Sequence, residues 1–208
     1  MSKGMKILIG VVIVLVVLGF MTYSFVKNTY NSLVMLDEEV NNTWAQVQNV
    51  YQRRADLIPN LVEVVKGYAS HERETLEAVI QARAAATRPQ INAAEVLQNP
   101  QLFQKFEQAQ GQLTAALGRL MVVIERYPEL KANQNFIRLQ DELAGTENRI
   151  AVERRRFNEA VRNYNQKLRS FPTVLFASMF GFQPRPYFQA AESAQEAPKV
   201  DFSNNKNK

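Results

Sequence analysis

A continuous apolar run near the amino terminus constrains this chain more than any other feature of its sequence. Residues 7–26, ILIGVVIVLVVLGFMTYSFV, contain no charged side chain, and Lys6 and Lys27 bracket the run. Twenty helical residues cover ~30 Å, the thickness of the hydrocarbon core of a bilayer. A single segment in lipid must satisfy its backbone hydrogen bonds internally. The run therefore predicts a transmembrane helix, and residues 1–6 a short basic lead.

A cleavable signal peptide is the alternative interpretation of this run. Such a peptide usually has a shorter apolar region, followed by a cleavage site with small side chains. Residues 21–26, MTYSFV, offer no site of that kind, and the apolar run is longer than such a region needs. The pattern favours a permanent anchor.

The distribution of basic residues predicts how the anchor is oriented. Lys3, Lys6 and the terminal amine precede the run, whereas Lys27 is followed by three acidic residues before the next basic residue, Arg53. Basic residues collect on the cytoplasmic side of a membrane. We therefore expect a cytoplasmic amino terminus and a main domain outside the cytoplasm.

The composition after the anchor indicates one helical domain. The chain is rich in Ala, Leu, Val, Gln, Glu and Arg, while 8 Gly and 8 Pro are few for 208 residues. β-rich domains need more turn residues, so an all-α fold is expected. The absence of cysteine excludes disulfides and thiolate metal sites. A net charge of +5, with basic and acidic residues interleaved, shows no basic stripe for nucleic acid.

Apolar residues recur in steps of three and four along four stretches, each closed by a proline. Helices are predicted from the anchor to near Leu57, from Pro59 to about Thr87, from about Gln101 to Pro128, and from 132 to 171. Each helix has one apolar stripe that it must bury against others. Residues 27–188 are thus predicted to form an antiparallel four-helix bundle with long helices. A parallel coiled coil is the alternative, and the prolines argue against it.

The end of the chain has two parts of different composition. Residues 171–188, FPTVLFASMFGFQPRPYF, are aromatic and are interrupted by Gly181, Pro184 and Pro186. Packing against the open end of the bundle is the simpler interpretation, and contact with membrane or a partner is the alternative. Residues 189–208 are polar and predict a disordered tail.

The residues needed for most catalytic and metal sites are missing from the sequence. His71 is the single histidine, so neither a two-histidine metal site nor a Cys–His pair can form. A di-iron bundle needs two Glu-x-x-His elements, and a glycine-rich phosphate loop is also missing. No catalytic residue, metal site or cofactor is predicted.

Three polar clusters lie at the first expected helix break, at the start of the last expected helix and in the middle of that helix. Their members are Arg53, Arg54, Asp56 and Asn60 at the first expected break, Asn133 and Asn135 at the start of the last helix, and Glu147, Asn148 and Arg149 in its middle. The structural interpretation has Asp56 pairing with an arginine, Asn60 capping helix ends, and Glu147 in a buried salt bridge that fixes register. A ligand site is the alternative.

Several motifs, in order, resemble the LemA family. They are YNSLV at 30–34, WAQV at 44–47, RRADLIPNLV at 53–62, VKGYASHE at 65–72, ANQNF at 132–136, LQDELAGTENRI at 139–150 and YN at 164–165, with FP at 171–172 and YF at 187–188. The resemblance covers residues 30–188, and the stretch 89–118 carries little of it.

The resemblance implies a bacterial protein with one transmembrane helix and a four-helix antiparallel bundle. It implies no catalytic residue and no cofactor, and a magnetosome-membrane protein also belongs to the family. We therefore expect a non-enzymatic scaffold in the bacterial inner membrane that self-associates and contacts unidentified membrane or envelope proteins. The alternative is a membrane-tethered sensor whose ligand pocket lies at residues 53–60 or 147–149. An enzyme is the weakest hypothesis.

Overall fold

The computed structural model describes residues 3–88 and 93–189, and the predicted tail lies, from residue 190 onward, outside them. Within these ranges the chain is helical and contains no strand, which confirms the all-α prediction. The helices are α1 (Lys3–Tyr68), α2 (Arg73–Ala86), α3 (Ala93–Gln98), α4 (Pro100–Ile124), α5 (Pro128–Lys131), α6 (Gln134–Arg169) and α7 (Val174–Ala177).

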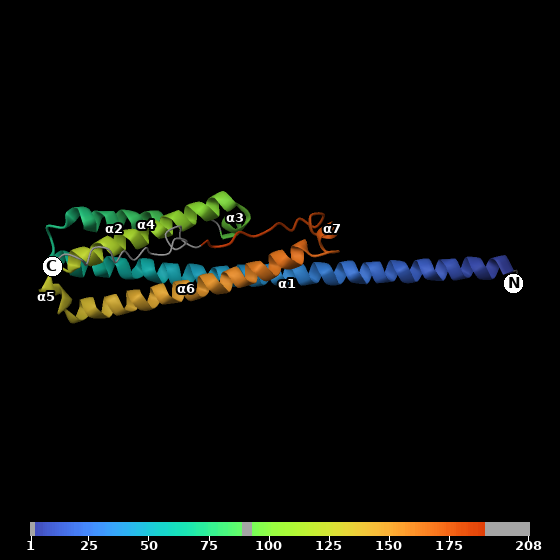
Figure 1. The fold of residues 1–208 in the computed structure, drawn as a ribbon, viewed down its shortest axis with the longest axis horizontal. Helices are drawn as coiled ribbons and strands as arrows, with labels where there is room; N and C mark the ends of the chain where they lie inside the picture. Colours follow the sequence, from blue (N-terminus) through green and yellow to red (C-terminus); the bar gives the residue numbers. More distant parts are fainter. Residues whose placement is uncertain (1–2, 89–92, 190–208) are drawn as a thin grey trace, which may run out of the picture.

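Helix α1 runs the whole length of the molecule, and α2, α4 and α6 lie along its carboxyl-terminal part (Figure 1). Helix α6 packs along α1, and α2 packs along α4. In Figure 1, α1 and α4 point toward one end of the molecule and α2 and α6 toward the other. The short helices α3 and α5 lie in the connections, and α7 lies beyond the end of α6.

The predicted helix break at Pro59 is wrong, because α1 continues through this proline to Tyr68. Proline has no backbone N–H, so the carbonyl of Ala55, four residues earlier, loses its normal helical donor. Arg83 of α2 replaces that donor, since its Nε lies 2.7 Å from the Ala55 oxygen. The break falls at residues 69–72 instead, and the first ten residues of the predicted second helix belong to α1.

Asparagine side chains cap the starts of the long helices α4 and α6. Asn99 precedes α4, and its Oδ1 accepts from the backbone N–H groups of Gln101 and Leu102 at 2.9 and 3.3 Å. Asn133 caps α6 in the same way, accepting from Asn135 and Phe136 at 2.9 and 3.1 Å. Asparagine is among the preferred residues at this position because its oxygen satisfies amides that the helix leaves free.

The buried core divides into a half near the apolar end of α1 and a half far from it. The near half is rich in aromatic side chains: Trp44, Tyr51, Phe103, Phe157, Tyr164 and Phe188. Aliphatic side chains predominate in the far half, among them Ile58, Leu61, Val62, Val65, Leu113, Leu117, Leu120, Ile124, Leu130 and Leu143, together with Phe136. In sequence along α1, Arg54 lies between the two halves.

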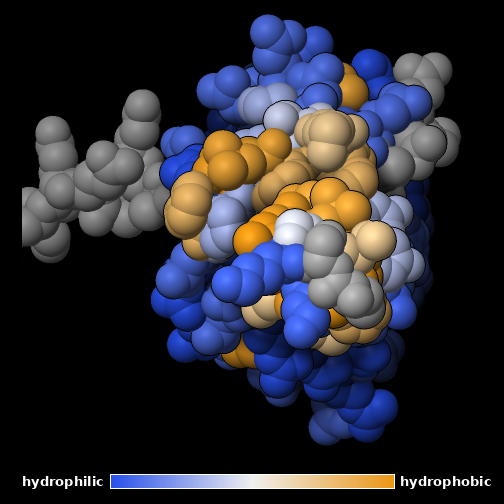
Figure 2. Space-filling model, turned by 90° about the vertical axis from the view of Figure 1, so that its right-hand side faces the viewer, coloured by the Kyte–Doolittle hydropathy of each residue, from blue (hydrophilic) through white to orange (hydrophobic). Residues whose placement is uncertain are grey.

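The amino-terminal part of α1 extends away from the other helices (Figure 1). By length and composition it could cross a membrane, and none of its most apolar window is buried in the protein. The first buried residue of α1 is Thr29, directly after the apolar run. Figure 2 looks at the molecule from this end and shows hydrophobic side chains gathered there, with hydrophilic side chains around them.

A second exposed apolar segment lies beside the end of the run. Residues 171–180, which we call the apolar turn, include α7 and expose Phe171, Leu175 and Met179 by 81, 62 and 69%. The ring of Phe176 lies 6.4 Å from that of Phe25, inside the apolar run of α1. The apolar turn is therefore level with the carboxyl end of that run.

Candidate functional site

One arginine in the middle of α1 is buried and bonded to two other helices. Arg54 is 1% exposed. Its Nη1 donates to Glu147 Oε1 of α6 at 2.8 Å and to Thr114 Oγ1 of α4 at 2.9 Å. Its Nη2 donates to the side-chain oxygen of Gln110 at 2.5 Å. The guanidinium thus joins α1, α4 and α6.

The same network reaches the end of α2. Gln110 donates from Nε2 to the carbonyl of Ala86 at 3.1 Å, so all four long helices take part. The guanidinium also lies 5.1 Å from the ring centre of Tyr51. Burial raises the pKa of the Tyr51 phenol above its usual value, which keeps this ring neutral. Because a buried charge tolerates few alternative positions, this network favours one relative placement of the helices.

The neighbouring arginine has a different environment. Arg53 lies 3.9 Å from Glu142, and both side chains are 54% exposed, so this pair adds little stability. Asp56 accepts from Gln52 at 2.7 Å rather than from an arginine as expected. Arg53, Asp56 and Glu142 line an open surface depression together with Arg149.

The remaining predicted residues lie apart from the Arg54 network. Asn60 and Asn148 are exposed, and Asn60 has no helix end to cap because α1 continues past it. Asn133 caps α6 and also donates to the hydroxyl of Tyr68 at 2.9 Å. Asn135 is exposed in the first turn of α6. The structure therefore pairs the buried Arg54 with Glu147, whose side chain is 38% exposed, and distributes the others over the surface.

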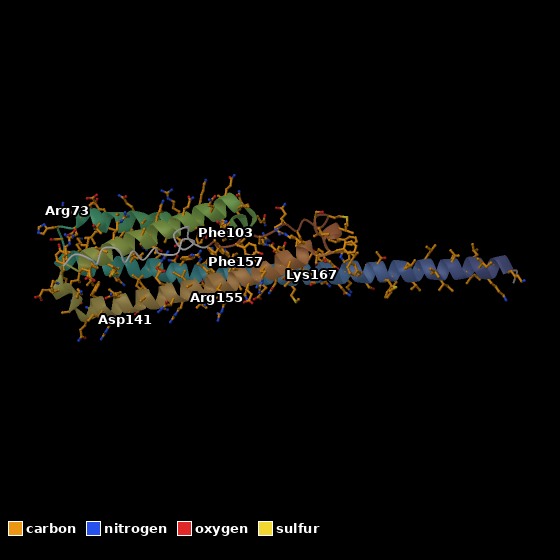
Figure 3. The ribbon with its side chains drawn as sticks, in the orientation of Figure 1. Arg73, Phe103, Asp141, Arg155, Phe157 and Lys167 are labelled. Carbon is orange, nitrogen blue, oxygen red and sulfur yellow. The ribbon has the colours of Figure 1, made fainter. Side chains whose placement is uncertain are left out.

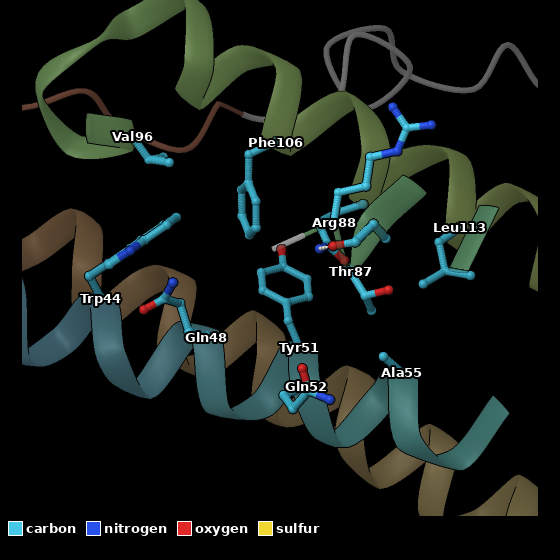
Figure 4. Close-up of a pocket in the computed structure, with 12 residues that line it drawn as sticks. Trp44, Gln48, Tyr51, Gln52, Ala55, Thr87, Arg88, Val96, Phe106 and Leu113 are labelled. Carbon is cyan, nitrogen blue, oxygen red and sulfur yellow. Dashed lines mark hydrogen bonds between the residues drawn. The ribbon is translucent and has the colours of Figure 1, made fainter. Parts of the chain in front are cut away.

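A cavity of about 180 Å³ lies beside the Arg54 network. In Figure 4 its wall is formed by Trp44, Gln48 and Tyr51 from α1, with Phe106 opposite them on α4. The full lining is Trp44, Gln48, Tyr51, Gln52, Ala55, Ala86, Thr87, Arg88, Val96, Phe106, Gln110 and Leu113.

The cavity is lined by both polar groups and aromatic rings. The indole Nε1 of Trp44 is buried and has no hydrogen-bond partner within the described residues. The aromatic rings of Trp44, Tyr51 and Phe106 could cover the apolar part of a small molecule. Across residues 3–88 and 93–189, no cluster of three or more His, Cys, Asp or Glu could hold a metal ion.

A further site holds an extended segment against α6. The sequence analysis expected residues 171–188 to pack against the open end of the bundle, and the last part of that segment packs along α6. We call residues 182–189 the strap, since they are neither helix nor strand and lie along the near half of the core. Asn165 accepts the N–H of Arg185 and donates to its carbonyl, both at 2.9 Å. Asn158 makes the same two bonds with Phe188, again at 2.9 Å.

Two side chains of the strap enter the bundle. Arg185 Nε and Nη2 donate to Asp37 Oδ1 of α1 at 3.0 and 2.7 Å. Phe188 is 6% exposed, and its ring centre lies 4.9 Å from that of Phe103 and 5.4 Å from that of Phe157. The sequence signal that could have revealed this contact is the pair of asparagines seven residues apart on the apolar side of α6.

The far end of the strap contacts an ion pair. Glu107 of α4 and Arg154 of α6 lie 3.3 Å apart. The N–H of Gln189 donates to Glu107 at 3.2 Å, and Arg154 donates to the Gln189 carbonyl at 3.1 Å. Burial raises the pKa of Glu107, and the N–H bond and the arginine oppose that rise.

The chain was compared with protein families and with curated proteins. A sequence model of the LemA family matches residues 43–202. Magnetosome protein MamQ 2 of Paramagnetospirillum magneticum is 26% identical over 204 residues, which cover 91% of this chain and 74% of that protein. Magnetosome protein MamQ of Magnetospirillum gryphiswaldense is 26% identical over 203 residues, covering 90% and 74%. Protein LemA of Metamycoplasma hominis is 24% identical over 162 residues, covering 78% and 69%.

Proposed function

Since the chain belongs to the LemA family, we propose that it is a non-enzymatic scaffold whose apolar helix anchors an antiparallel four-helix bundle in a bacterial membrane. The observation that carries this proposal is the continuity of α1, which runs for 66 residues from the apolar run into the core. An anchor and a domain that share one helix move as a single body. Partners bound to the bundle are thereby held at a defined distance from the membrane.

The position of the apolar turn supports the same proposal. The rings of Tyr30 and Phe180 lie 5.2 Å apart, so this turn packs against α1 at the place where the span ends. Leu175 and Met179 leave most of their apolar surface outside the core, being 62 and 69% exposed. We infer that the bilayer surface covers them. The base of the bundle then rests on the membrane.

The expected setting is the inner membrane, with a cytoplasmic amino terminus and the bundle outside the cytoplasm. Basic residues before the span and acidic residues after it support this orientation. Because the chain has no cysteine, a maleimide can label only an introduced thiol, and the labelling shows on which side of the membrane that thiol lies. An Asp141→Cys variant in intact cells should react with a membrane-impermeant maleimide. Reaction only after lysis would show that the bundle lies in the cytoplasm, opposite to the proposed orientation.

Self-association and contact with other membrane proteins complete the proposed role. The relatives described above are LemA and magnetosome proteins, and none of those names denotes an enzymatic activity. Tethering to one surface raises the effective concentration of partners without new contacts.

Purification in detergent-free membrane patches, followed by mass photometry and mass spectrometry, tests the scaffold. We expect several copies in one patch, alone or with a partner in fixed proportion. A lone copy without companions contradicts the proposal.

A ligand-binding sensor is the second candidate, and the cavity beside Arg54 favours it. The predicted pocket was at residues 53–60 or 147–149, where the structure has an open surface depression lined by Arg53 and Arg149. The more enclosed cavity lies beside it and is lined by Trp44 and Tyr51. Native mass spectrometry of protein released from membranes would reveal a bound small molecule. The sensor requires that this extra mass disappear in a Gln48→Trp variant, whose larger side chain fills the cavity.

A further inference from the structure

We propose that the groove around the strap is a binding site for extended, proline-containing peptide, and that its ligand in trans is the strap of a second copy. The groove is formed by α1, α4 and α6. This inference rests on the proposed self-association and assigns it a site. The residues that bind the strap belong to neither the Arg54 network nor the nine predicted polar positions.

The groove holds the main chain of the strap in a way that does not depend on its side chains. Asn158 and Asn165 each bind both the N–H and the C=O of a single strap residue. Seven residues of helix α6 advance by ~10.5 Å. Three residues of a polyproline II chain advance by ~9.3 Å, and residues three apart face the same side. The two asparagines thus match Arg185 and Phe188, which are three residues apart.

The composition of the strap fits that conformation. Pro184 and Pro186 flank Arg185, and proline fixes φ near the polyproline II value. Peptides of this kind bind in grooves lined by aromatic rings. Here the rings are those of Trp44, Phe103 and Phe157, around Phe188.

Two pockets give the groove a sequence preference. One is Asp37, which receives both Nε and Nη2 of Arg185, a side chain that is only 10% exposed. The other is the aromatic cluster that buries Phe188. Arg154 closes this pocket, with its guanidinium carbon 4.5 Å from the centre of the Phe188 ring. The groove therefore selects an arginine followed three residues later by a phenylalanine.

The connection to the strap allows exchange between copies. Gly181 directly precedes the strap and has a φ of +79°, a conformation that other residues rarely adopt. A strap bound in trans makes the same contacts as one bound in cis. The difference in free energy between the two forms therefore depends only on the hinge conformation and on the local concentration of copies. Anchoring in one membrane brings copies close together, which favours exchange.

Complementation between two full-length variants tests this inference. The strap variant, Arg185→Ala with Phe188→Ala, keeps its groove, and the groove variant, Asn158→Ala with Asn165→Ala, keeps its strap. The two carry different tags and are co-expressed and captured in membrane patches. We expect mixed pairs to exceed pairs of the strap variant by about tenfold, since only a mixed pair has a matched strap and groove. Mixed pairs no more frequent than like pairs would overturn the inference.

A second experiment keeps the native residues of the groove and the strap, so it does not depend on the folding of either variant. A protease site replaces residues 178–180 in the otherwise native chain, and cleavage frees the strap from its tether. A fluorescent peptide of residues 181–189, GFQPRPYFQ, should then bind with saturation, and the peptide with alanine at 185 and 188 should bind much more weakly. Equal binding of the two peptides, or none, overturns the site.

The two experiments separate this inference from the proposed scaffold. If copies associate in membrane patches but mixed pairs are no more frequent than like pairs, the strap is not their link and only this inference fails. If the peptide binds and the protein is a lone copy in patches, self-association fails and the second copy is excluded as the ligand.

Discussion

The two halves of the bundle core use different side chains. The far half consists mainly of Leu, Ile and Val, and its walls are helices and their short connections. The near half is rich in aromatic side chains. One of its walls is the extended strap rather than a helix, and Phe188 of the strap packs into this half. This half also contains the cavity beside Trp44 and Tyr51. The far half is thus closed by helices alone, whereas the near half contains the cavity and the proposed strap site.

The largest expected effect comes from the charge between the two halves. A Glu147→Leu change leaves the Arg54 guanidinium buried without its anion, and should lower the free energy of unfolding by about 3 kcal/mol. Glu142→Leu on the same helix is the matched control, because its partner Arg53 is half exposed. The control should change stability by less than about 0.5 kcal/mol.

Urea unfolding followed by circular dichroism measures both changes. Equal losses for the two variants would show that burial of Arg54 adds nothing to its pairing with Glu147. The Arg54–Glu147 pair between the two halves would then contribute no more to stability than an exposed ion pair.

The next effect should appear in the near half alone. Phe188→Ala empties a pocket among three aromatic rings and should cost about 3 kcal/mol in the free energy of strap docking. Trp44 is the single tryptophan and its ring lies 6.0 Å from that of Phe188, so its fluorescence reports this half. Hydrogen exchange should increase in residues 183–189 and stay unchanged in α2.

The control for this change is Tyr187→Ala, since Tyr187 is 40% exposed beside Phe188. It should leave the fluorescence of Trp44 and the exchange of the strap nearly as in the native chain. Faster exchange in α2 after Phe188→Ala would show that the two halves unfold together.

A smaller effect is expected where α1 passes Pro59 in the far half. Arg83→Met removes the donor to the Ala55 carbonyl and should cost about 1–2 kcal/mol of stability. Pro59→Ala returns a backbone N–H to that carbonyl. In a double-mutant cycle, the Arg83 change should therefore cost less when Pro59 is already alanine. Strict additivity of the two changes would contradict this explanation of the unbroken helix.

The smallest effect is a dependence on pH in the near half. Burial, with Asp37 nearby, raises the pKa of Tyr164 to about 12, while tyrosine in an unfolded chain ionises near 10. Between these values the unfolded chain has lost a proton that the folded chain keeps. Stability is therefore complete below a pH of about 10 and falls as the pH rises toward 12.

Tyr164→Phe cannot ionise and should lose less stability over that interval. It also lacks the hydroxyl that donates to the Gln183 carbonyl at 3.0 Å, so it should begin slightly less stable at neutral pH. Urea unfolding at a pH of about 9 and about 11 distinguishes the two chains. Parallel losses with pH would exclude Tyr164 as the titrating group.

Much of the fold could be predicted from the spacing of apolar residues. The stripe from Leu33 through Tyr51 and the one from Phe136 through Leu168 lie on α1 and α6, and most of their residues are buried. The break at Pro59 was predicted wrongly because a local rule ignores Arg83, which is distant in sequence and supplies the missing donor. Local patterns cannot show which distant side chain will reach a free carbonyl.

The candidate sites were predictable only in part. The sequence analysis expected Glu147 in a buried salt bridge, and in the structure Glu147 pairs with the buried Arg54 while its own side chain is 38% exposed. It did not distinguish Arg54 from Arg53, because one step along a helix turns a side chain by about 100° and so decides burial. Packing of residues 171–188 on the bundle was expected, but the role of Asn158 and Asn165 was not, because they bind the main chain of an extended segment, a contact without apolar periodicity.

The central claim is that anchor and bundle form one body whose base rests on the membrane. Fluorophores on single cysteines at Leu175, in the apolar turn, and at Asp141, near the opposite end of the molecule, test it in liposomes with nitroxide-labelled lipid (Figure 3). The account predicts strong quenching at position 175 and little at 141. Equal, weak quenching at both positions would show that the bundle stands clear of the bilayer, and would contradict the account.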